Sequence, residues 1–217
     1  MKKLITILTF MFLFQISNGQ DTIRRFEFGS TLVTINSFNT NNYFATDRPS
    51  VEFINGIFFR YTKKRLGLRA HVSYTDNSTS YATPASWSDG SSGDINNKDF
   101  RIGVGGQLSL LKRKEWLYTF LDLSYRNVFS DGHQYGGYVG ANNKFSRTSN
   151  GFDSFLGLGF KIKTIKHVYL SPEIGYFCST KFVNQTTTSL NSGQSTKFNY
   201  SEIDLTPLMK LHLTVKF

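Results

Sequence analysis

His71 and Ser73 are candidates for a catalytic pair, because one side chain is a base and the other carries a hydroxyl. A histidine can act as a general base toward a serine hydroxyl, and a hydroxyl activated in this way can attack an acyl ester. The two residues stand two positions apart in an alternating segment, so both side chains would lie on one face of a strand. Residues at i and i+2 of a strand need not touch, so the spacing alone does not make a catalytic pair.

The tripeptide His71-Val72-Ser73 resembles the His-x-Ser pair of lipid A deacylase barrels, which also use a distant acid. The resemblance implies an enzyme that acts on lipid A or a phospholipid, with His71 as base and Ser73 as nucleophile. The pair departs from that pattern because it falls on the third expected strand and points inward, away from lipid. We therefore predict no catalytic residue and no enzyme activity, and keep the lipid-acting enzyme as an alternative.

Other signatures of catalysis or cofactor binding do not emerge from the sequence. His133, His167 and His212 are scattered singly, and no cluster has the spacing of metal ligands. Residues 103–106 are glycine-rich but precede no expected helix, so they do not form a phosphate-binding loop. Cys178 is the only cysteine, which excludes an intramolecular disulfide framework. We expect no cofactor and no metal.

Segments that alternate apolar and polar residues with a period of two must position any site in this chain. They predict strands at residues 25–35, 51–61, 66–75, 100–110, 117–126, 152–162, 168–177 and 202–217. The facing of the first strand is ambiguous, because Phe26, Phe28 and Leu32 share one parity while Val33 and Ile35 share the other. The pattern predicts an all-β fold, an eight-stranded antiparallel transmembrane up-and-down β-barrel.

The connections between these strands are long and short in turn. Polar loops are expected at residues 36–50, 76–98, 129–150 and 180–197, and short basic turns at 62–65, 112–115 and 163–167. A barrel with an even number of strands has short turns on the periplasmic side and long loops outside. The exposed loop aromatics that could contact an extracellular partner are Tyr81, Trp87, Tyr135 and Tyr138.

Both ends of the chain carry targeting patterns. A basic start, an apolar run over residues 4–16 and small residues at 17 and 19 predict a signal peptide of residues 1–19, with a cut after Gln20 as the alternative. The apolar run is shorter than the about 20 residues that a membrane-spanning helix needs. Residues 20–217 then form one barrel domain. The last strand alternates up to a terminal aromatic, with Leu211, Leu213, Val215 and Phe217 on its apolar face.

Signal peptide, alternating strands, basic short turns, Asn/Ser/Thr-rich loops and the terminal Phe217 together resemble the small outer-membrane β-barrel proteins of the Bacteroidetes. These are similar in architecture to the OmpA transmembrane domain and to OmpX. The resemblance implies residence in the outer membrane of a Gram-negative bacterium, with the loops facing the exterior. It also implies that Leu211, Leu213, Val215 and Phe217 are read by the barrel-assembly machinery. The role implied is structural, adhesive or accessory, and no catalytic residue can be transferred.

The inward face of the expected barrel is rich in charged residues of both signs. An eight-stranded barrel is just wide enough for side chains to fill it, and buried charges must be paired or hydrogen-bonded. We therefore predict a paired polar plug rather than a conducting pore, with inward glycines making room for long side chains. The predicted polar network consists of Arg69, His71, Arg101, Gln107, Asp122, Arg126, Asp153, Lys161, Glu173, Asp204 and Lys210.

Composition fits a protein at a lipid surface. The formal net charge of +10 falls to +8 when Lys2 and Lys3 leave with the signal peptide. No basic cluster with interleaved aromatics indicates a nucleic-acid surface, so anionic lipid headgroups or lipopolysaccharide phosphates are the expected partners. Aromatic residues gather at strand ends, which predicts two interfacial girdles. The short-turn girdle would comprise Phe58, Phe59, Tyr61, Trp116, Tyr118, Tyr169 and Phe217.

A soluble barrel of the lipocalin type is the remaining alternative. Such a barrel has apolar residues inside and binds a small hydrophobic ligand there. The charge-rich polar face and the terminal Phe217 count against it.

Overall fold

The computed structural model describes an antiparallel all-β protein. It describes residues 26–36, 50–82, 91–111, 114–136 and 141–217. The strands are β1 (Phe26–Asn36), β2 (Ser50–Lys63), β3 (Leu66–Ala82), β4 (Ser91–Leu111), β5 (Lys114–Gly136), β6 (Ala141–Phe160), β7 (Ile162–Ile165), β8 (Val168–Ser189) and β9 (Ser195–Lys216).

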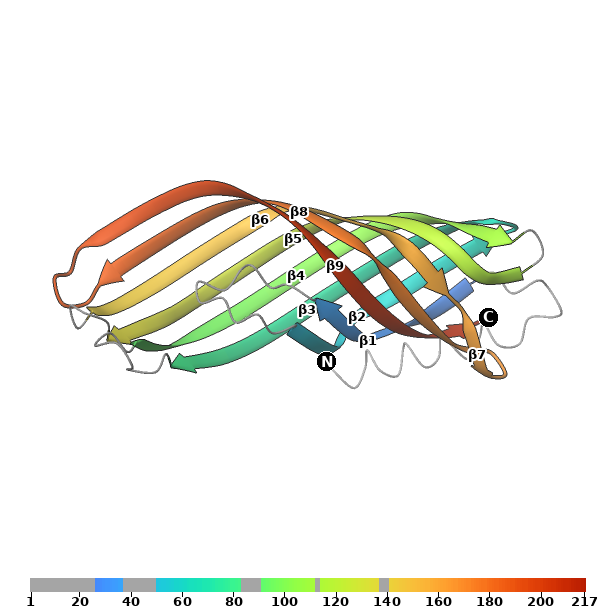
Figure 1. Cartoon of the computed structure of the whole chain (residues 1–217), viewed down its shortest axis with the longest axis horizontal. Helices are drawn as coiled ribbons and strands as arrows, with labels where there is room; N and C mark the ends of the chain where they lie inside the picture. Colours follow the sequence, from blue (N-terminus) through green and yellow to red (C-terminus); the bar gives the residue numbers. More distant parts are fainter. Residues whose placement is uncertain (1–25, 37–49, 83–90, 112–113, 137–140) are drawn as a thin grey trace, which may run out of the picture.

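The strands close into a ring (Figure 1). Neighbouring strands pair in chain order from β1 to β6 and from β7 to β9, β1 pairs with β9, and β6 pairs with β8. The short β7 continues β6 beyond Lys161 and pairs with the same neighbour, β8, so the ring has eight members. The predicted eight-stranded antiparallel barrel is confirmed. A closed ring has no edge strand with unpaired backbone groups.

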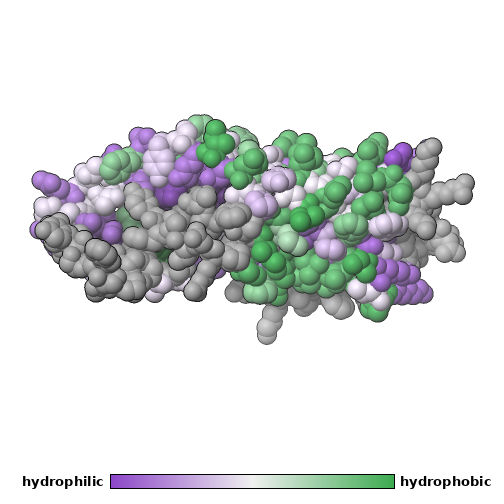
Figure 2. Space-filling view, viewed as in Figure 1, coloured by the Kyte–Doolittle hydropathy of each residue, from purple (hydrophilic) through white to green (hydrophobic). Residues whose placement is uncertain are grey.

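Alternating residues of each strand face opposite sides of the wall. On β3, Leu66 and Leu68 are about two-thirds exposed on the outer side, whereas Gly67 and Arg69 are buried on the inner side. The apolar outer residues gather over the half of the barrel that carries the short turns, and polar residues cover much of the other half (Figure 2). The wall therefore has an apolar belt and a polar extension.

The polar extension is built from strands, where the sequence predicted long loops. The segments expected as loops at 76–98, 129–150 and 180–197 lie largely in strands, for example in ladders that run to Ala82 and Ser189. The loop prediction was wrong there because both faces of these strands carry mostly polar residues, so the sequence loses its apolar period while backbone pairing continues. Residues 37–49 of the first expected loop lie outside the described residues.

A bulge in the first hairpin explains the mixed parity of its sequence. The registers of β1 with β2 and with β9 both shift between Thr31 and Val33. Glu27 and Thr31 point inward before the shift, and Thr34 points inward after it. On β2, Ile54 accommodates the shift with a φ of 48°, a rare conformation for a β-branched residue.

Candidate functional site

The end of the lumen nearest the short turns is organised around Glu173 of β8. Its carboxylate accepts hydrogen bonds from Arg60 at 3.2 Å and Arg69 at 2.8 Å. The Tyr118 hydroxyl donates to it at 2.7 Å, and His212 Nε2 lies 3.1 Å away. All of these side chains are almost fully buried. Glu173 thus connects strands from opposite parts of the ring through charge-assisted hydrogen bonds.

Two further acids complete this network. Glu27 of β1 pairs with Arg60 at 2.9 Å and with Lys161 at 2.6 Å. Asp122 of β5 pairs with Arg69 at 2.9 Å. Each arginine is therefore shared between two carboxylates, which offsets the cost of removing the charges from water. We call this set, formed by Glu27, Arg60, Arg69, Tyr118, Asp122, Lys161, Glu173 and His212, the lumen network.

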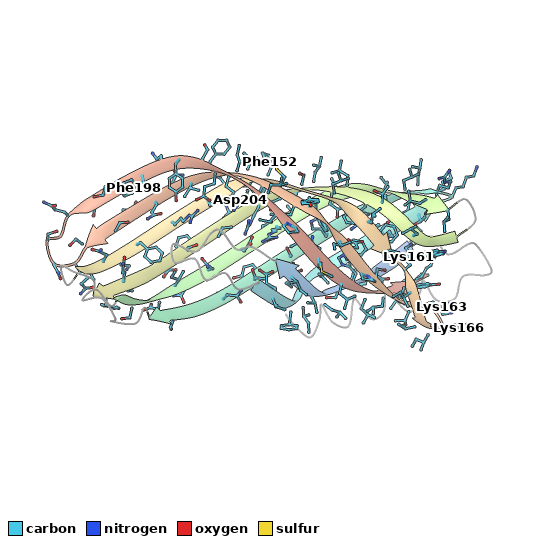
Figure 3. The ribbon with its side chains drawn as sticks, in the orientation of Figure 1. Phe152, Lys161, Lys163, Lys166, Phe198 and Asp204 are labelled. Carbon is cyan, nitrogen blue, oxygen red and sulfur yellow. The ribbon has the colours of Figure 1, made fainter. Side chains whose placement is uncertain are left out.

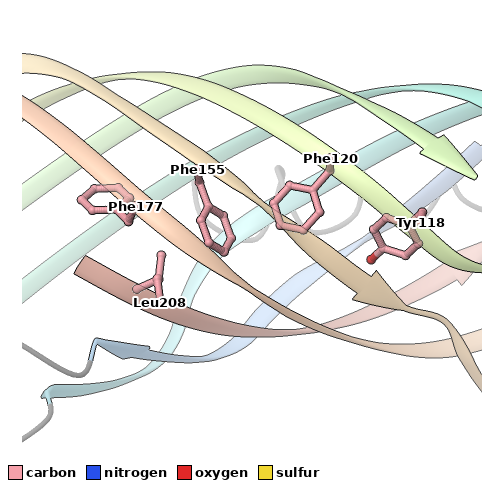
Figure 4. Close-up of a cluster of buried hydrophobic side chains, with 5 residues drawn as sticks. All are labelled: Tyr118, Phe120, Phe155, Phe177 and Leu208. Atoms are coloured by element: carbon pink, nitrogen blue, oxygen red, sulfur yellow. The ribbon is translucent and has the colours of Figure 1, made fainter. Parts of the chain in front are cut away.

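Aromatic rings fill the space between these charges. Tyr118, Phe120, Phe155 and Phe177 follow one another along the barrel, with Leu208 opposite them (Figure 4). The Phe120 and Phe155 rings pack edge to face at 4.9 Å. Arg69 lies 4.1 Å above the Phe120 ring and Lys210 4.9 Å above the Phe155 ring, distances at which a cation is attracted to the ring face. Rings and charges together form a packed plug.

A second set of ion pairs lies toward the polar extension. Asp99 is shared by Arg101 at 2.6 Å and Arg126 at 2.7 Å. Further along, Lys181 pairs with Asp204 at 2.8 Å. Burial lowers the pKa of the Lys181 ammonium, nearby Arg126 lowers it further, and the hydrogen bond to Asp204 acts in the opposite direction. Beyond this point Arg147 pairs with Glu202 at 2.8 Å, so opposite charges alternate along much of the inner wall.

The residues that the sequence assigned to the polar network all come from the inner face, but they do not form one cluster. Arg69, Asp122, Lys161 and Glu173 meet in the lumen network, as described above. The buried members are Arg69, Gln107, Asp122, Asp153, Lys161 and Glu173, and the half-buried members are His71, Arg101, Arg126, Asp204 and Lys210.

Several members of the site were missed from the sequence. Glu27 lies on β1, whose facing was ambiguous because of the bulge, and Arg60 lies beside it on the inner face of β2. Asp99 and Lys181 fell in or at the border of segments expected as loops. His212 lay on the expected wet face of the last strand but had no visible partner. Its parity was the available signal, and only the register places it beside Glu173.

His71 bonds to a different serine from the one that the tripeptide suggests. Its Nε2 lies 3.0 Å from Ser124 Oγ on β5, two strands away. Gly103 on the intervening strand permits this contact, because a Cβ there would lie 2.5 Å from His71 Cε1 and 2.6 Å from Ser124 Oγ. The hydrogen bond of His71 therefore does not support the interpretation of His71 and Ser73 as a pair of base and nucleophile.

A hydroxyl, imidazole and carboxylate also line up at His212. Its Nδ1 lies 3.1 Å from Thr31 Oγ1, and its Nε2 lies 3.1 Å from Glu173. This is the order of a hydrolytic triad. Thr31 is only 7% exposed, however, and His212 is stacked on Phe58 with ring centroids 4.4 Å apart. The hydroxyl is therefore buried, and the arrangement is part of the plug.

Two residues expected in the short-turn girdle lie inside instead. Phe58 and Tyr118 are buried in the plug, because their parity is that of Arg60 and Phe120. Phe59 and Trp116 remain on the outer face. Towards the extension, outward aromatic residues stay exposed. They include Tyr74, Phe100, Tyr125, Phe152 and Tyr176, of which Phe152 is labelled in Figure 3.

The remaining predicted sites are only partly described. Tyr135 lies on β5, is exposed, and stacks on His133. Trp87, Tyr138 and the side chain of Tyr81 fall outside the described residues, as does the predicted signal peptide. On the last strand, Leu213 and Val215 face outward, and the backbone N–H of Phe217 donates to Phe26 at 2.8 Å.

Comparisons with known proteins add little to this description. No protein-family model and no curated protein sequence matches the chain. The similar solved structures include Acinetobacter baumannii CarO and CarO2, each at 12% identity. The CarO match covers 87% of this chain and 98% of CarO with a TM-score of 0.46, and the CarO2 match covers 88% and 99% with a TM-score of 0.43. These values carry no inference about function.

No helix among the described residues is long and apolar enough to cross a membrane. No group of three His, Cys, Asp or Glu side chains in the same part of the chain could hold a metal ion.

Proposed function

We propose that the chain is an integral outer-membrane β-barrel whose lumen is plugged. The observation that carries this proposal is the inverted arrangement of the wall, with apolar side chains outside and charges inside. Leu68, Leu123, Phe152 and Leu205 are each more than half exposed, and similar residues surround the ring. Soluble monomers rarely expose apolar patches larger than a few hundred Å², whereas a barrel in lipid requires an apolar belt.

The same inversion disfavours a soluble lipocalin-like barrel. A lipocalin keeps its apolar residues inside, around a ligand cavity. Here the inner space holds the lumen network and the aromatic row, and the inner cations and acids pair with one another. A small hydrophobic ligand would have to displace buried ion pairs, which is costly.

The proposed role is structural, adhesive or accessory, and not enzymatic. The short turns would face the periplasm and the strand extension would face the exterior, where it presents Ser-, Thr- and Asn-rich strands to a partner. The resemblance to the small Bacteroidetes barrels, OmpA and OmpX supports this orientation. The hydrogen bond between His71 and Ser124 and the burial of Thr31 support a role other than that of a lipid-acting enzyme.

Membrane fractionation combined with gel mobility tests this proposal. Inner and outer membranes from cells that express the chain would be separated, and the outer-membrane band would be run on SDS gels with and without boiling. The proposal predicts an outer-membrane band that shifts on heating, because a closed barrel resists SDS until it is heated. A band in the soluble fraction whose mobility does not change would refute it.

A further inference from the structure

The outer wall contains one feature that a lipid-facing surface does not need, a groove of about 990 Å³ over the short-turn half of β2 to β6. It is lined by apolar side chains that include Phe59, Leu66, Leu108 and Leu121. The volume is at the upper end of the range for small-molecule sites. In a lipid-facing surface without such a groove, neighbouring side chains would extend about equally far from the backbone.

Small residues on successive strands create this groove. Ala70 on β3, Gly106 on β4 and Thr119 on β5 all belong to its lining. Gly106 pairs with Leu68 on one side and with Leu121 on the other, so the depression at Gly106 lies between two large side chains. Ala70 lies two residues after Leu68 on β3, and Thr119 lies two residues before Leu121 on β5. The three small residues therefore form a depression that runs diagonally across β3, β4 and β5.

The groove changes from apolar to basic along one edge. Phe59, Tyr61 and Lys63 follow one another on the outer face of β2 and all line it. Lys63 is exposed and leads into the turn that contains Lys64 and Arg65. A surface that passes from hydrocarbon to ammonium over one strand end complements a molecule with an acyl chain and an anionic headgroup.

We propose that this groove binds one molecule of an anionic phospholipid, with an acyl chain over Gly106 and the phosphate beside Lys63. The inference rests on the proposed membrane barrel, in which the short turns and Lys63 meet the phospholipid leaflet. Exposed lysines near such a headgroup contribute about a fivefold change in affinity each, so Lys63 would provide selectivity and the apolar groove most of the binding.

A side chain can be added at Gly106 to fill the groove without a clash. A Cβ added there would meet no heavy atom closer than the Gly67 carbonyl oxygen at 3.9 Å, and its φ is not in the left-handed region. Gly106→Leu should therefore fold and occupy the space intended for the acyl chain. Cys178→Leu, at a half-buried position on the outer parity of β8, is the matched control for added outer volume.

The test is native mass spectrometry of the detergent-purified chain with added phosphatidylglycerol or phosphatidylethanolamine. We expect one phosphatidylglycerol bound to the wild type, at least tenfold weaker binding by Gly106→Leu, and a preference for phosphatidylglycerol reduced about fivefold in Lys63→Gln. Cys178→Leu and Lys163→Gln, which removes a charge at another short turn (Figure 3), should bind like the wild type.

Equal phosphatidylglycerol binding by all variants would overturn the proposal, as would preferential retention of lipopolysaccharide or a groove-dependent dimer mass. The gel shift on heating is recorded for each variant. It reports the barrel independently of the lipid, so loss of the membrane fold and loss of the lipid site are distinguishable.

Discussion

Glu173→Gln is the substitution that tests the plug most sharply. The amide preserves the size of the side chain but removes the charge that Arg60 and Arg69 share. Removing one partner of a buried ion pair costs about 3–5 kcal/mol, because the other charge stays buried. Arg60 retains Glu27 and Arg69 retains Asp122, so we expect the lower end, a loss of about 3 kcal/mol in the free energy of unfolding.

The assay is equilibrium unfolding in urea of the chain refolded in detergent micelles, with the gel shift on heating as a second readout. Glu202→Gln is the control, since Glu202 pairs with Arg147 where both side chains are partly exposed, at 25% and 14%. Ion pairs at the surface contribute about 0–1 kcal/mol, and we expect this half-buried pair to contribute less than the fully buried one. If Glu173→Gln loses no more stability than Glu202→Gln, the plug does not depend on the lumen network and our reasoning is wrong.

Other substitutions examine separate parts of the structure. Gly103→Val should lower the yield of barrel that shifts on heating, because the added Cβ would lie 2.5 Å from His71 Cε1. Gly106→Ala should fold normally, and equal yields of the two variants would contradict this packing. Ser73→Ala should leave the lipid A of expressing cells unchanged when analysed by mass spectrometry, and a change relative to wild type would revive the enzyme hypothesis. The purified chain should give no stable conductance steps in planar bilayers, since the lumen is filled, and regular steps would contradict the plug. Deletion of Phe217 should reduce assembly in cells but not refolding in micelles; equal assembly of both chains in cells would exclude the assembly signal.

Alternation made the barrel predictable from the sequence. Between Leu66 and Thr75 every apolar residue faces outward, because one face meets the belt and the other meets the lumen. The ring of eight strands follows from such segments and from their connections. The strand extensions could not be predicted in the same way, because segments such as 180–189 carry mostly polar residues on both faces and show no apolar period.

The lumen partners were beyond the sequence for a different reason. Which acid meets which base depends on the stagger between strands, and on bulges such as that at Ile54, neither of which a period of two records. Parity correctly placed His71 inside, for example, but not beside Ser124, which requires the register of three strands and the absence of a side chain at Gly103.

Spin labelling of the outer wall tests directly whether the barrel spans a membrane. In a Cys178→Ser background, a label at Leu123→Cys would lie in the apolar belt, and a label at Lys144→Cys would lie on the exposed extension. Collision rates with oxygen, which concentrates in lipid, and with a water-soluble nickel chelate would be compared after reconstitution in phospholipid vesicles. If the barrel spans the membrane, collisions with oxygen are more frequent at position 123 and collisions with the chelate are more frequent at position 144. Equal access of the chelate to both labels would contradict a membrane-spanning barrel.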